Sequence, residues 1–368
     1  MNLYLIAFYS IGGLLLITTT ITVYNFCTAP RIRNQSYPLV QKPLISILIP
    51  ARNEEKNIAE TLRALLQQSY TNYEVILLDD HSEDDTYELA EEIAGTTEKV
   101  TLVRGKPLPP GWLGKNWACF QLTEYARGEV YLFIDADVHL SNRALEAALH
   151  TMHEHTVVML SCFPTQNIGS TGAWLIVPLM NWLLLSLLPL KLVTASSYPS
   201  LAAANGQFML CSKKPYDAIG GHEAVADQVV EDMELARRFK RSNYPIMTAV
   251  SYGALNCRMY GGFIDAFKGF SKNFFPGFSV SPLIFLCILT GLITVFFTPF
   301  IFVIFRAYYL WLVLLIIIGR VIVSRISSQN PLINVILHPL QMLCMVLTGA
   351  NSLYWTLTGK TVWKGRNI

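Results

Sequence analysis

Long uncharged stretches at both ends of the sequence constrain its fold more than any other feature. Residues 1–30 contain no Asp, Glu, Lys or Arg, and neither do residues 273–305, 307–319 and 326–359. A helix that crosses a bilayer needs about 20 consecutive apolar residues. The sequence therefore predicts an N-terminal transmembrane helix at 1–30 and further transmembrane helices over 277–358.

Basic residues next to the first apolar segment predict its orientation. Arg31, Arg33 and Lys42 follow the segment, and short loops rich in Lys and Arg remain in the cytoplasm. We therefore expect a multi-pass protein of the cell membrane with a cytoplasmic soluble domain. A cleaved signal peptide is the alternative, but no basic region precedes the apolar run. Two C-terminal spans plus a re-entrant segment would keep the basic tail 359–368 in the cytoplasm, whereas three spans would place it outside.

Composition argues against two other classes of protein. The chain is 52% hydrophobic and only 15% charged, and its net charge of +2 gives no reason to expect a nucleic-acid partner. The seven cysteines include no C-x-x-C pair, so we expect neither a disulfide framework nor a zinc site. The histidines of HTMHEHT are interpreted as a solvated helix end, because no fourth metal ligand is evident.

The charged middle of the chain alternates between strand-like and helix-like segments. Four apolar runs with the length and composition of buried strands are LISILIP, YEVILL, KVTLVRG and VYLFI. Segments with apolar residues at helical spacing separate these runs, as in IAETLRALLQQS. This alternation predicts a doubly wound α/β domain, which binds its ligands at the carboxyl ends of the strands.

Acidic residues follow two of the four predicted strands. Asp79 and Asp80 come after the second run, and Asp135 and Asp137 come after the fourth. Residues two positions apart on an extended chain point to the same side. Two carboxylates at such a short distance repel each other unless a cation lies between them. The pattern indicates oxygen ligands for a divalent cation that also holds phosphate; a solvated turn is the alternative.

Four motifs in this order resemble those of the inverting family-2 glycosyltransferases, which have the GT-A nucleotide-sugar fold. They are ILIPARNEE, VILLDDHSEDDT, FIDADV and VVEDMELARRF, and the resemblance covers about residues 44–270. KPLPPGWLGKNWACFQ, CRMYGGF and WKGR further resemble the membrane-bound branch that acts on carotenoid-like lipids, of the diaponeurosporenoate type, and on hopanoid-like lipids.

The resemblance implies a role for each matching residue. Asp232 would be the general base that removes the proton of the acceptor, and Asp137 would hold Mg²⁺ or Mn²⁺ on the diphosphate. The nucleotide would contact Pro50, Ala51, Arg52, Asn53, Glu54, Asp79, Asp80, Lys115 and Asp135. Weaker assignments to the acceptor or the diphosphate fall on Glu231, Trp112, Trp117 and Lys272.

Several of these residues also have simpler interpretations. Glu231 and Asp232 suit the first turn of a helix, where acidic side chains complement the helix dipole. Lys115 is interpreted alternatively as an ordinary loop lysine, and the two tryptophans as residues of a membrane interface.

The expected domain boundaries follow from the same patterns. They are a transferase domain at 40–255 with an interfacial element at 172–193, an amphipathic interfacial segment at 256–276, transmembrane helices at 277–358 and a basic tail at 359–368. Processive members of the family carry Q-x-x-R-W after the base. The corresponding region here, FIDAFKGFSKNFFPGF, has no Arg-Trp pair, which argues against processive polymer synthesis.

The function expected from the sequence is transfer of a sugar from a nucleotide-sugar, such as a UDP-hexose, to a lipid-like acceptor with inversion at the anomeric carbon. The acceptor would be a carotenoid, hopanoid or glycerolipid at the cytoplasmic face of the membrane. The alternatives are a sugar transferase acting on polyprenyl phosphate, a polysaccharide synthase and a non-catalytic membrane scaffold.

Overall fold

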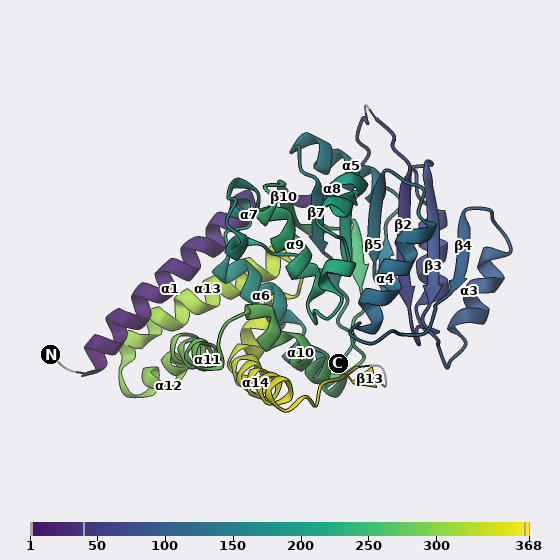
Figure 1. The fold of residues 1–368 in the computed structure, drawn as a ribbon. Coiled ribbons are helices and arrows are strands. Elements are labelled where there is room, and N and C mark those ends of the chain that lie inside the picture. The colour runs from purple at the N-terminus through teal and green to yellow at the C-terminus, as the bar shows by residue number, and fades with distance from the viewer. Residues whose placement is uncertain (1–2, 40, 364–365, 368) are drawn as a thin grey trace. The chain divides into compact units, whose positions relative to one another are not determined.

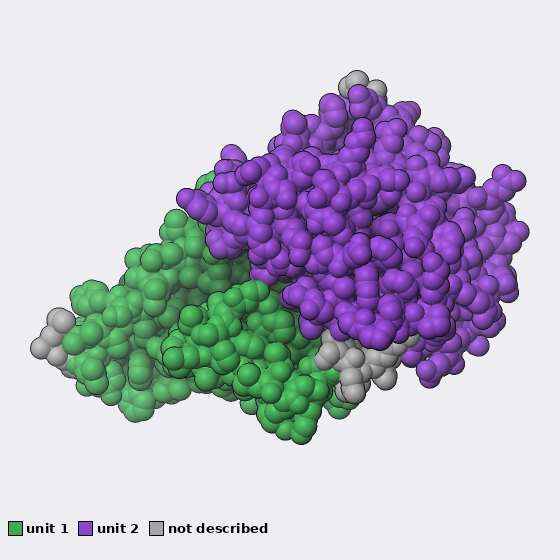
Figure 2. Space-filling model, in the orientation of Figure 1, with its two compact units in different colours: residues 1–29, 166–190, 259–368 green, residues 30–165, 191–258 purple. Residues whose placement is uncertain are grey.

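The computed structural model describes residues 3–39, 41–363 and 366–367 (Figure 1). The chain forms two compact units, which Figure 2 colours purple and green. We call residues 30–165 and 191–258 the sheet unit, and residues 1–29, 166–190 and 259–368 the helical unit.

An eight-stranded sheet forms the centre of the sheet unit, with the strand order β1-β10-β7-β9-β5-β2-β3-β4. The strands are β1 (Arg31–Arg33), β2 (Ile45–Ala51), β3 (Tyr73–Asp79), β4 (Val100–Arg104), β5 (Val130–Ile134), β7 (Met159–Phe163), β9 (Phe208–Ser212) and β10 (Ile246–Tyr252). Neighbouring strands are parallel except at β9, which is antiparallel to both β5 and β7. The expected α/β fold is confirmed, and its sheet is mixed.

The helices of the sheet unit cover the sheet because their apolar side chains recur every three or four residues. In α2, Ile58, Leu62 and Leu65 are fully buried. Both faces of the sheet are covered in this way, so β2 and β3 are apolar along most of their length. The helices are α2 (Ile58–Leu66), α3 (Thr86–Ala94), α4 (Gly114–Tyr125), α5 (Ala144–Glu154), α7 (Lys191–Ala195), α8 (Lys213–Ala218), α9 (Glu231–Arg241), η2 (Pro199–Leu201) and η3 (Glu223–Val225).

Short strands make two smaller sheets. β6 (Val138–Leu140), β11 (Leu255–Cys257) and β8 (Thr165–Gln166) form a three-stranded sheet in the order β6-β11-β8. β12 (Val362–Trp363) and β13 (Arg366–Asn367) pair in antiparallel orientation.

Three helices of the described chain are long and apolar enough to cross a membrane, namely residues 3–28, 307–326 and 331–358. The sequence-based expectation of such helices at both ends is confirmed. A bend of 114° separates α10 from α11, and this pair would be a broken span or a re-entrant loop. The elements of the helical unit are α1 (Leu3–Thr28), η1 (Ala173–Leu175), α6 (Pro178–Leu187), α10 (Phe263–Phe278), α11 (Pro282–Phe296), α12 (Thr298–Phe305), η4 (Ala307–Tyr309), α13 (Leu310–Ile326) and α14 (Pro331–Thr358).

Helices α1 and α13 run side by side and in the same direction (Figure 1). The Tyr309 hydroxyl donates to the backbone oxygen of Tyr4 at 2.8 Å near the start of both helices. Further along, a Cβ atom on Gly319 would lie 4.0 Å from the Thr19 hydroxyl. The two helices are therefore parallel neighbours.

Asn25 joins α1 to the end of α6. Its side-chain amide donates to the backbone oxygens of Leu185 and Leu188, each at 2.8 Å, and its side-chain oxygen accepts from the Leu190 N–H at 2.9 Å. The last carbonyl groups of a helix have no partner within the helix. A buried polar side chain of α1 thus satisfies carbonyl groups at the end of the neighbouring helix α6.

Candidate functional site

The carboxyl ends of three neighbouring parallel strands bring the predicted nucleotide-binding residues together. Strands β5, β2 and β3 are adjacent, and Ala51 at the end of β2 is in register with Asp79 at the end of β3. The Asp80 N–H donates to the Ala51 oxygen at 2.8 Å. Asp135 follows β5 at the same edge.

The loops that follow β2 and β3 are bonded to each other. The Arg52 guanidinium donates to the backbone oxygens of Asp80 at 2.7 Å and of His81 at 2.9 Å. Asn53, which has φ of 52°, accepts from the Glu83 N–H at 2.8 Å. These bonds fix a continuous rim at the edge of the sheet.

Three more residues of the predicted nucleotide set lie at this rim. The Glu54 N–H donates to the Thr86 hydroxyl at 2.7 Å. One carboxylate oxygen of Asp79 accepts from the Ser82 N–H at 3.3 Å, and the other is buried without a hydrogen-bond partner among the described residues. Pro50 is half-buried and is in register with Leu78 of β3, the strand that ends at Asp79.

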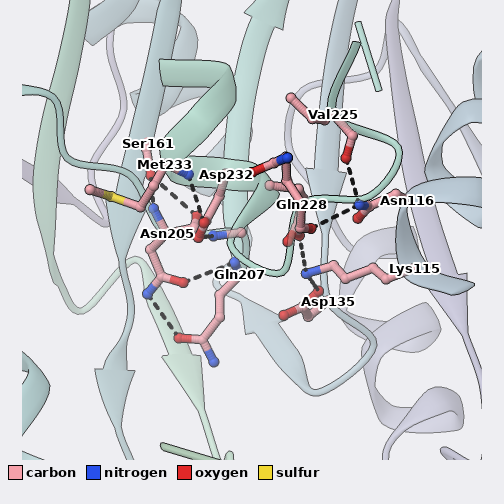
Figure 3. Close-up of polar contacts among 12 residues, drawn as sticks. Lys115, Asn116, Asp135, Ser161, Asn205, Gln207, Val225, Gln228, Asp232 and Met233 are labelled. Carbon is pink, nitrogen blue, oxygen red and sulfur yellow. Dashed lines mark hydrogen bonds and ion pairs between the residues drawn. The ribbon is translucent and has the colours of Figure 1, made fainter. Parts of the chain in front are cut away.

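Lys115 links two predicted site residues that are far apart in the sequence. Its Nζ atom lies 2.8 Å from Asp135 Oδ1 (Figure 3) and 3.1 Å from Glu231 Oε1. Lys115 belongs to the first turn of α4, and Glu231 is the first residue of α9. One ammonium group therefore lies between two carboxylates from different elements.

Asp232 is held by backbone N–H groups in the same cluster. Its Oδ1 atom accepts from the Met233 N–H at 2.7 Å (Figure 3), and its Oδ2 atom accepts from the Gly206 N–H at 2.6 Å. A Cβ atom on Gly206 would lie 3.0 Å from Lys115 Nζ and 3.5 Å from Asp232 Oδ2. Gly206 thus lets the chain pass between the ammonium group and the carboxylate.

The electrostatics of this cluster shift two pKa values. Burial and the charge of Glu231 raise the pKa of Asp232 to about 6, although Lys115 and the two N–H donors act in the opposite direction. Burial acts to lower the pKa of Lys115, but the carboxylates of Asp135 and Glu231 outweigh it and hold that pKa well above its usual value. Asp232 is therefore suited to gain and lose a proton near neutral pH.

Asp137 lies in the turn between β5 and β6. Burial, followed by the charges of Asp137 and Asp135, raises the pKa of the Cys257 thiol, which stays protonated. Among the described residues no group of three or more His, Cys, Asp or Glu side chains could hold a metal ion. Mg²⁺ commonly binds one or two carboxylates together with substrate phosphates. Asp135 and Asp137 fit that kind of site.

The weaker predictions fall in two places. Trp112 and Trp117 lie with ring centroids 5.1 Å apart, and Trp117 stacks on Phe120 at 5.6 Å. The Trp117 indole also donates to the Lys106 oxygen. Lys272 belongs to α10 of the helical unit, and its contact with a diphosphate stays a prediction.

Asn116 is a site residue that the sequence reasoning missed. Its amide donates to the backbone oxygens of Val225 at 2.8 Å and Gln228 at 2.9 Å (Figure 3), and to that of Ala226 at 3.1 Å. These bonds hold the segment that leads into α9 and so position Glu231. No motif distance signals this contact, because Asn116 lies beside Lys115 in the chain but more than a hundred residues from its acceptors.

Gly206 and its neighbours were also missed. Asn205 and Gln207 hydrogen-bond each other at 3.1 Å on either side of the glycine, and the Asn205 N–H donates to Ser161 Oγ at 2.7 Å (Figure 3). The Asn-Gly pair before the strand-like run QFML is a turn signal and could have indicated this loop.

Comparison with known families finds a match for the middle of the chain. Residues 46–220 match the family model Glycosyl transferase family 2. This chain therefore contains a family 2 glycosyltransferase domain.

Two relatives carry the same name. The chain is 29% identical over 243 residues to the 4,4'-diaponeurosporenoate glycosyltransferase of Staphylococcus haemolyticus (strain JCSC1435). The aligned region covers 64% of this chain and 62% of that protein. The chain is 27% identical over 273 residues to the protein of that name from Staphylococcus aureus (strain USA300), covering 71% and 70% of the two chains. The match thus spans less than two thirds of the first relative.

A solved structure has a similar fold. It is a mannosyltransferase from Pyrobaculum calidifontis in complex with GDP-Man and Mn²⁺, with a TM-score of 0.57 and 17% sequence identity. The similarity covers 96% of this chain and 97% of that one. At this identity it shows a shared GT-A-like fold.

Proposed function

We propose that this protein transfers a sugar from a nucleotide-sugar, with UDP as the nucleotide, to a lipid-like acceptor of the carotenoid type. The observation that carries the proposal is the cluster of Lys115, Asp135, Glu231 and Asp232 at the carboxyl edge of the sheet. The names of the two staphylococcal relatives support the acceptor class.

The donor would bind over the rim formed by the loops after β2 and β3. The Asp79 carboxylate oxygen without a partner among the described residues is a buried acceptor, and a buried acceptor gains when a ligand donor reaches it. The N–H edge of a uracil ring is such a donor. The bonds that Arg52 makes to the neighbouring loop would keep this acceptor in place before the donor arrives.

Asp137, with Asp135, would hold a divalent cation on the diphosphate. When bound, the cation would neutralise charge on the leaving nucleoside diphosphate. In this arrangement the ion pair with Lys115 would hold the Asp135 carboxylate in position.

Asp232 would act as the general base. The acceptor oxygen attacks the anomeric carbon, the bond from that carbon to the diphosphate breaks, and its electron pair leaves with the diphosphate. Where the acceptor is a hydroxyl group, its proton passes to the Asp232 carboxylate, whose pKa of about 6 suits this transfer. A single displacement of this kind inverts the anomeric centre.

The lipid-like acceptor and the apolar helices fit a reaction at a membrane surface. The three long helices support a multi-pass protein of the cell membrane, and the basic residues after α1 favour a cytoplasmic sheet unit, where nucleotide-sugars are available. The interfacial positions of segments 172–193 and 256–276, and the side on which the C-terminal tail lies, stay predictions.

The test is transfer by the purified full chain in nanodiscs. Radiolabelled UDP-hexoses are supplied with carotenoid carboxylic acids, hopanoid alcohols and diacylglycerol, and lipid extracts are analysed for a hexose-sized increase in mass. Labelled lipid is expected from at least one pair. Absence of UDP binding and of UDP-sugar hydrolysis under all of these conditions would contradict the proposal.

A further inference from the structure

Helix α13 contains a buried cation that has no acidic partner in the described part of the chain. Arg320 is only 1% exposed. The sequence of the helical unit contains a single acidic residue, Asp265, which forms no ion pair with Arg320. An unpaired charge in a low-dielectric interior is costly, and ionisable residues within apolar helices mark binding sites more often than structural ones.

The contacts of Arg320 satisfy only part of its guanidinium group. Nη2 donates to the side-chain oxygens of Asn334, at 3.4 Å, and of Gln341. The Nε and Nη1 atoms are buried and have no hydrogen-bond partner among the described residues. The Trp182 ring lies 6.0 Å from Cζ. Neutral amides do not compensate the charge, and two donors are left for an anion.

A small cavity adjoins these donors within the helical unit. Arg320 contributes to its wall together with Thr18, Thr19, Thr22, Trp182 and Ser186, and apolar side chains complete the lining. The cavity has room for a group of about the size of one water molecule. The Thr18 and Thr22 hydroxyl groups donate to backbone oxygens of α1, so the donors that face the cavity are the hydroxyl groups of Thr19 and Ser186 and the guanidinium group. Around a space of this size, these donors suit one oxyanion oxygen.

The depth of the cavity suits a lipid rather than a free ion. At about 1.5 Å per residue, Arg320 lies about 9 Å from the end of α13 at Ile326, and Thr19 lies about 14 Å from the end of α1 at Thr28. In a hydrocarbon layer of about 30 Å, this level is between the midplane and the boundary. Thr18 and Thr19 are partly exposed at the rim of the cavity.

We propose that Arg320 and this cavity bind the oxyanion group of an amphipathic lipid, a carboxylate or a phosphate, whose chains remain in the bilayer. The anion would neutralise the buried guanidinium group and tie α13 to α1 and α6. The proposal requires the helical unit to lie in a membrane, but it does not depend on sugar transfer.

The first experiment uses the wild-type full chain in phosphatidylcholine nanodiscs. Trp182 contributes to the cavity wall, so a spin-labelled stearic acid bound there should quench its fluorescence; Trp182→Phe identifies that contribution. The acid should bind roughly tenfold or more tightly than its methyl ester, because only the acid offers a charged oxygen to Arg320. Equal quenching by acid and ester would overturn the proposal.

Competition experiments distinguish the possible sources of the oxyanion. Unlabelled phosphatidic acid should displace the labelled acid if the site accepts phosphate, and oleate alone should do so if it accepts only carboxylate. Millimolar inorganic phosphate should displace neither. Displacement by inorganic phosphate at the same concentration as the lipids would identify a free-anion site and contradict the lipid assignment.

A matched pair of variants completes the test. Arg320→Gln keeps a polar side chain but removes the charge, and Arg325→Gln removes an exposed charge one turn further along α13. The preference for acid over ester should disappear in Arg320→Gln and persist in Arg325→Gln. If Arg320→Gln folds, as judged by its thermal unfolding, and keeps the preference, the site is elsewhere. If it does not fold, the wild-type comparison of acid and ester decides.

Discussion

The backbone N–H of Gly206 donates a 2.6 Å hydrogen bond to the Asp232 carboxylate. Gly206 precedes β9 and Asp232 lies in the first turn of α9, so this bond joins a sheet strand to the helix that carries the proposed base. The other oxygen of this carboxylate accepts from the Met233 N–H in the first turn of α9. The position of the proposed base thus depends on a residue without a side chain.

Gly206→Ala should impair catalysis more than folding. The added Cβ would approach Lys115 Nζ to 3.0 Å and Glu231 Oε1 to 3.3 Å. Because the lysine end is flexible, the fold can adjust by moving it, but the ion pairs then change. We expect kcat to fall roughly 10-fold to 100-fold with little change in Tm. Gly262→Ala, whose Cβ meets nothing within 4 Å, is the control. Equal activities of the two variants would contradict the role of Gly206.

The pH dependence of transfer should report on Asp232. A general base works in its unprotonated form, and the folded-state pKa is raised to about 6 by burial and by Glu231. The value of kcat/KM should therefore rise with pH up to about 6 and then level off. Donor binding measured over the same pH range separates titration of the diphosphate from that of the base. A flat profile between pH 5 and 7 would exclude Asp232 as the titrating base.

Removal of the Lys115 charge should move that titration. Lys115 lowers the pKa of Asp232, so Lys115→Met should shift the acid limb of the kcat/KM profile upward by roughly one pH unit. Activity should also fall, because Asp135 and Glu231 lose the cation between them. Lys115→Arg keeps the charge and should leave the limb near its original position. An unshifted limb in Lys115→Met would mean that the lysine acts only through structure.

The proposed cation site predicts a dependence on Asp137. Asp137→Asn removes an anionic ligand and should abolish transfer and weaken Mn²⁺-supported donor binding. The matched control is Asp227→Asn, which changes an exposed carboxylate. Full activity in EDTA, or unchanged UDP affinity in Asp137→Asn, would show that Asp137 does not hold a metal.

The sequence indicated the edge of the sheet at which these residues meet, because apolar strands in βα alternation place their carboxyl ends together. Asp79 and Asp135 could therefore be assigned to one edge. The contact of Lys115 with Glu231 could not be predicted from the sequence. The antiparallel strand β9 is inserted between β5 and β7, and no local sequence pattern indicates this insertion. Arg320 lies between two of the uncharged stretches, but only the packing shows that it is buried, without an acidic partner among the described residues.

The central claim is that Asp232 removes the acceptor proton. Asp232→Asn keeps an oxygen that can accept from the Gly206 N–H, so the loop should hold its position. If Asp232 only complements the helix dipole, the change should cost about 1 kcal/mol of stability and leave turnover nearly intact.

The most direct measurement is the transfer rate and the UDP affinity of Asp232→Asn and Glu231→Gln, each in nanodiscs beside the wild type. We predict that Asp232→Asn lowers kcat by roughly 100-fold or more with UDP affinity unchanged, and that Glu231→Gln has a smaller effect. Near-normal turnover in Asp232→Asn would contradict the account, and a larger loss in Glu231→Gln would move the base to that residue.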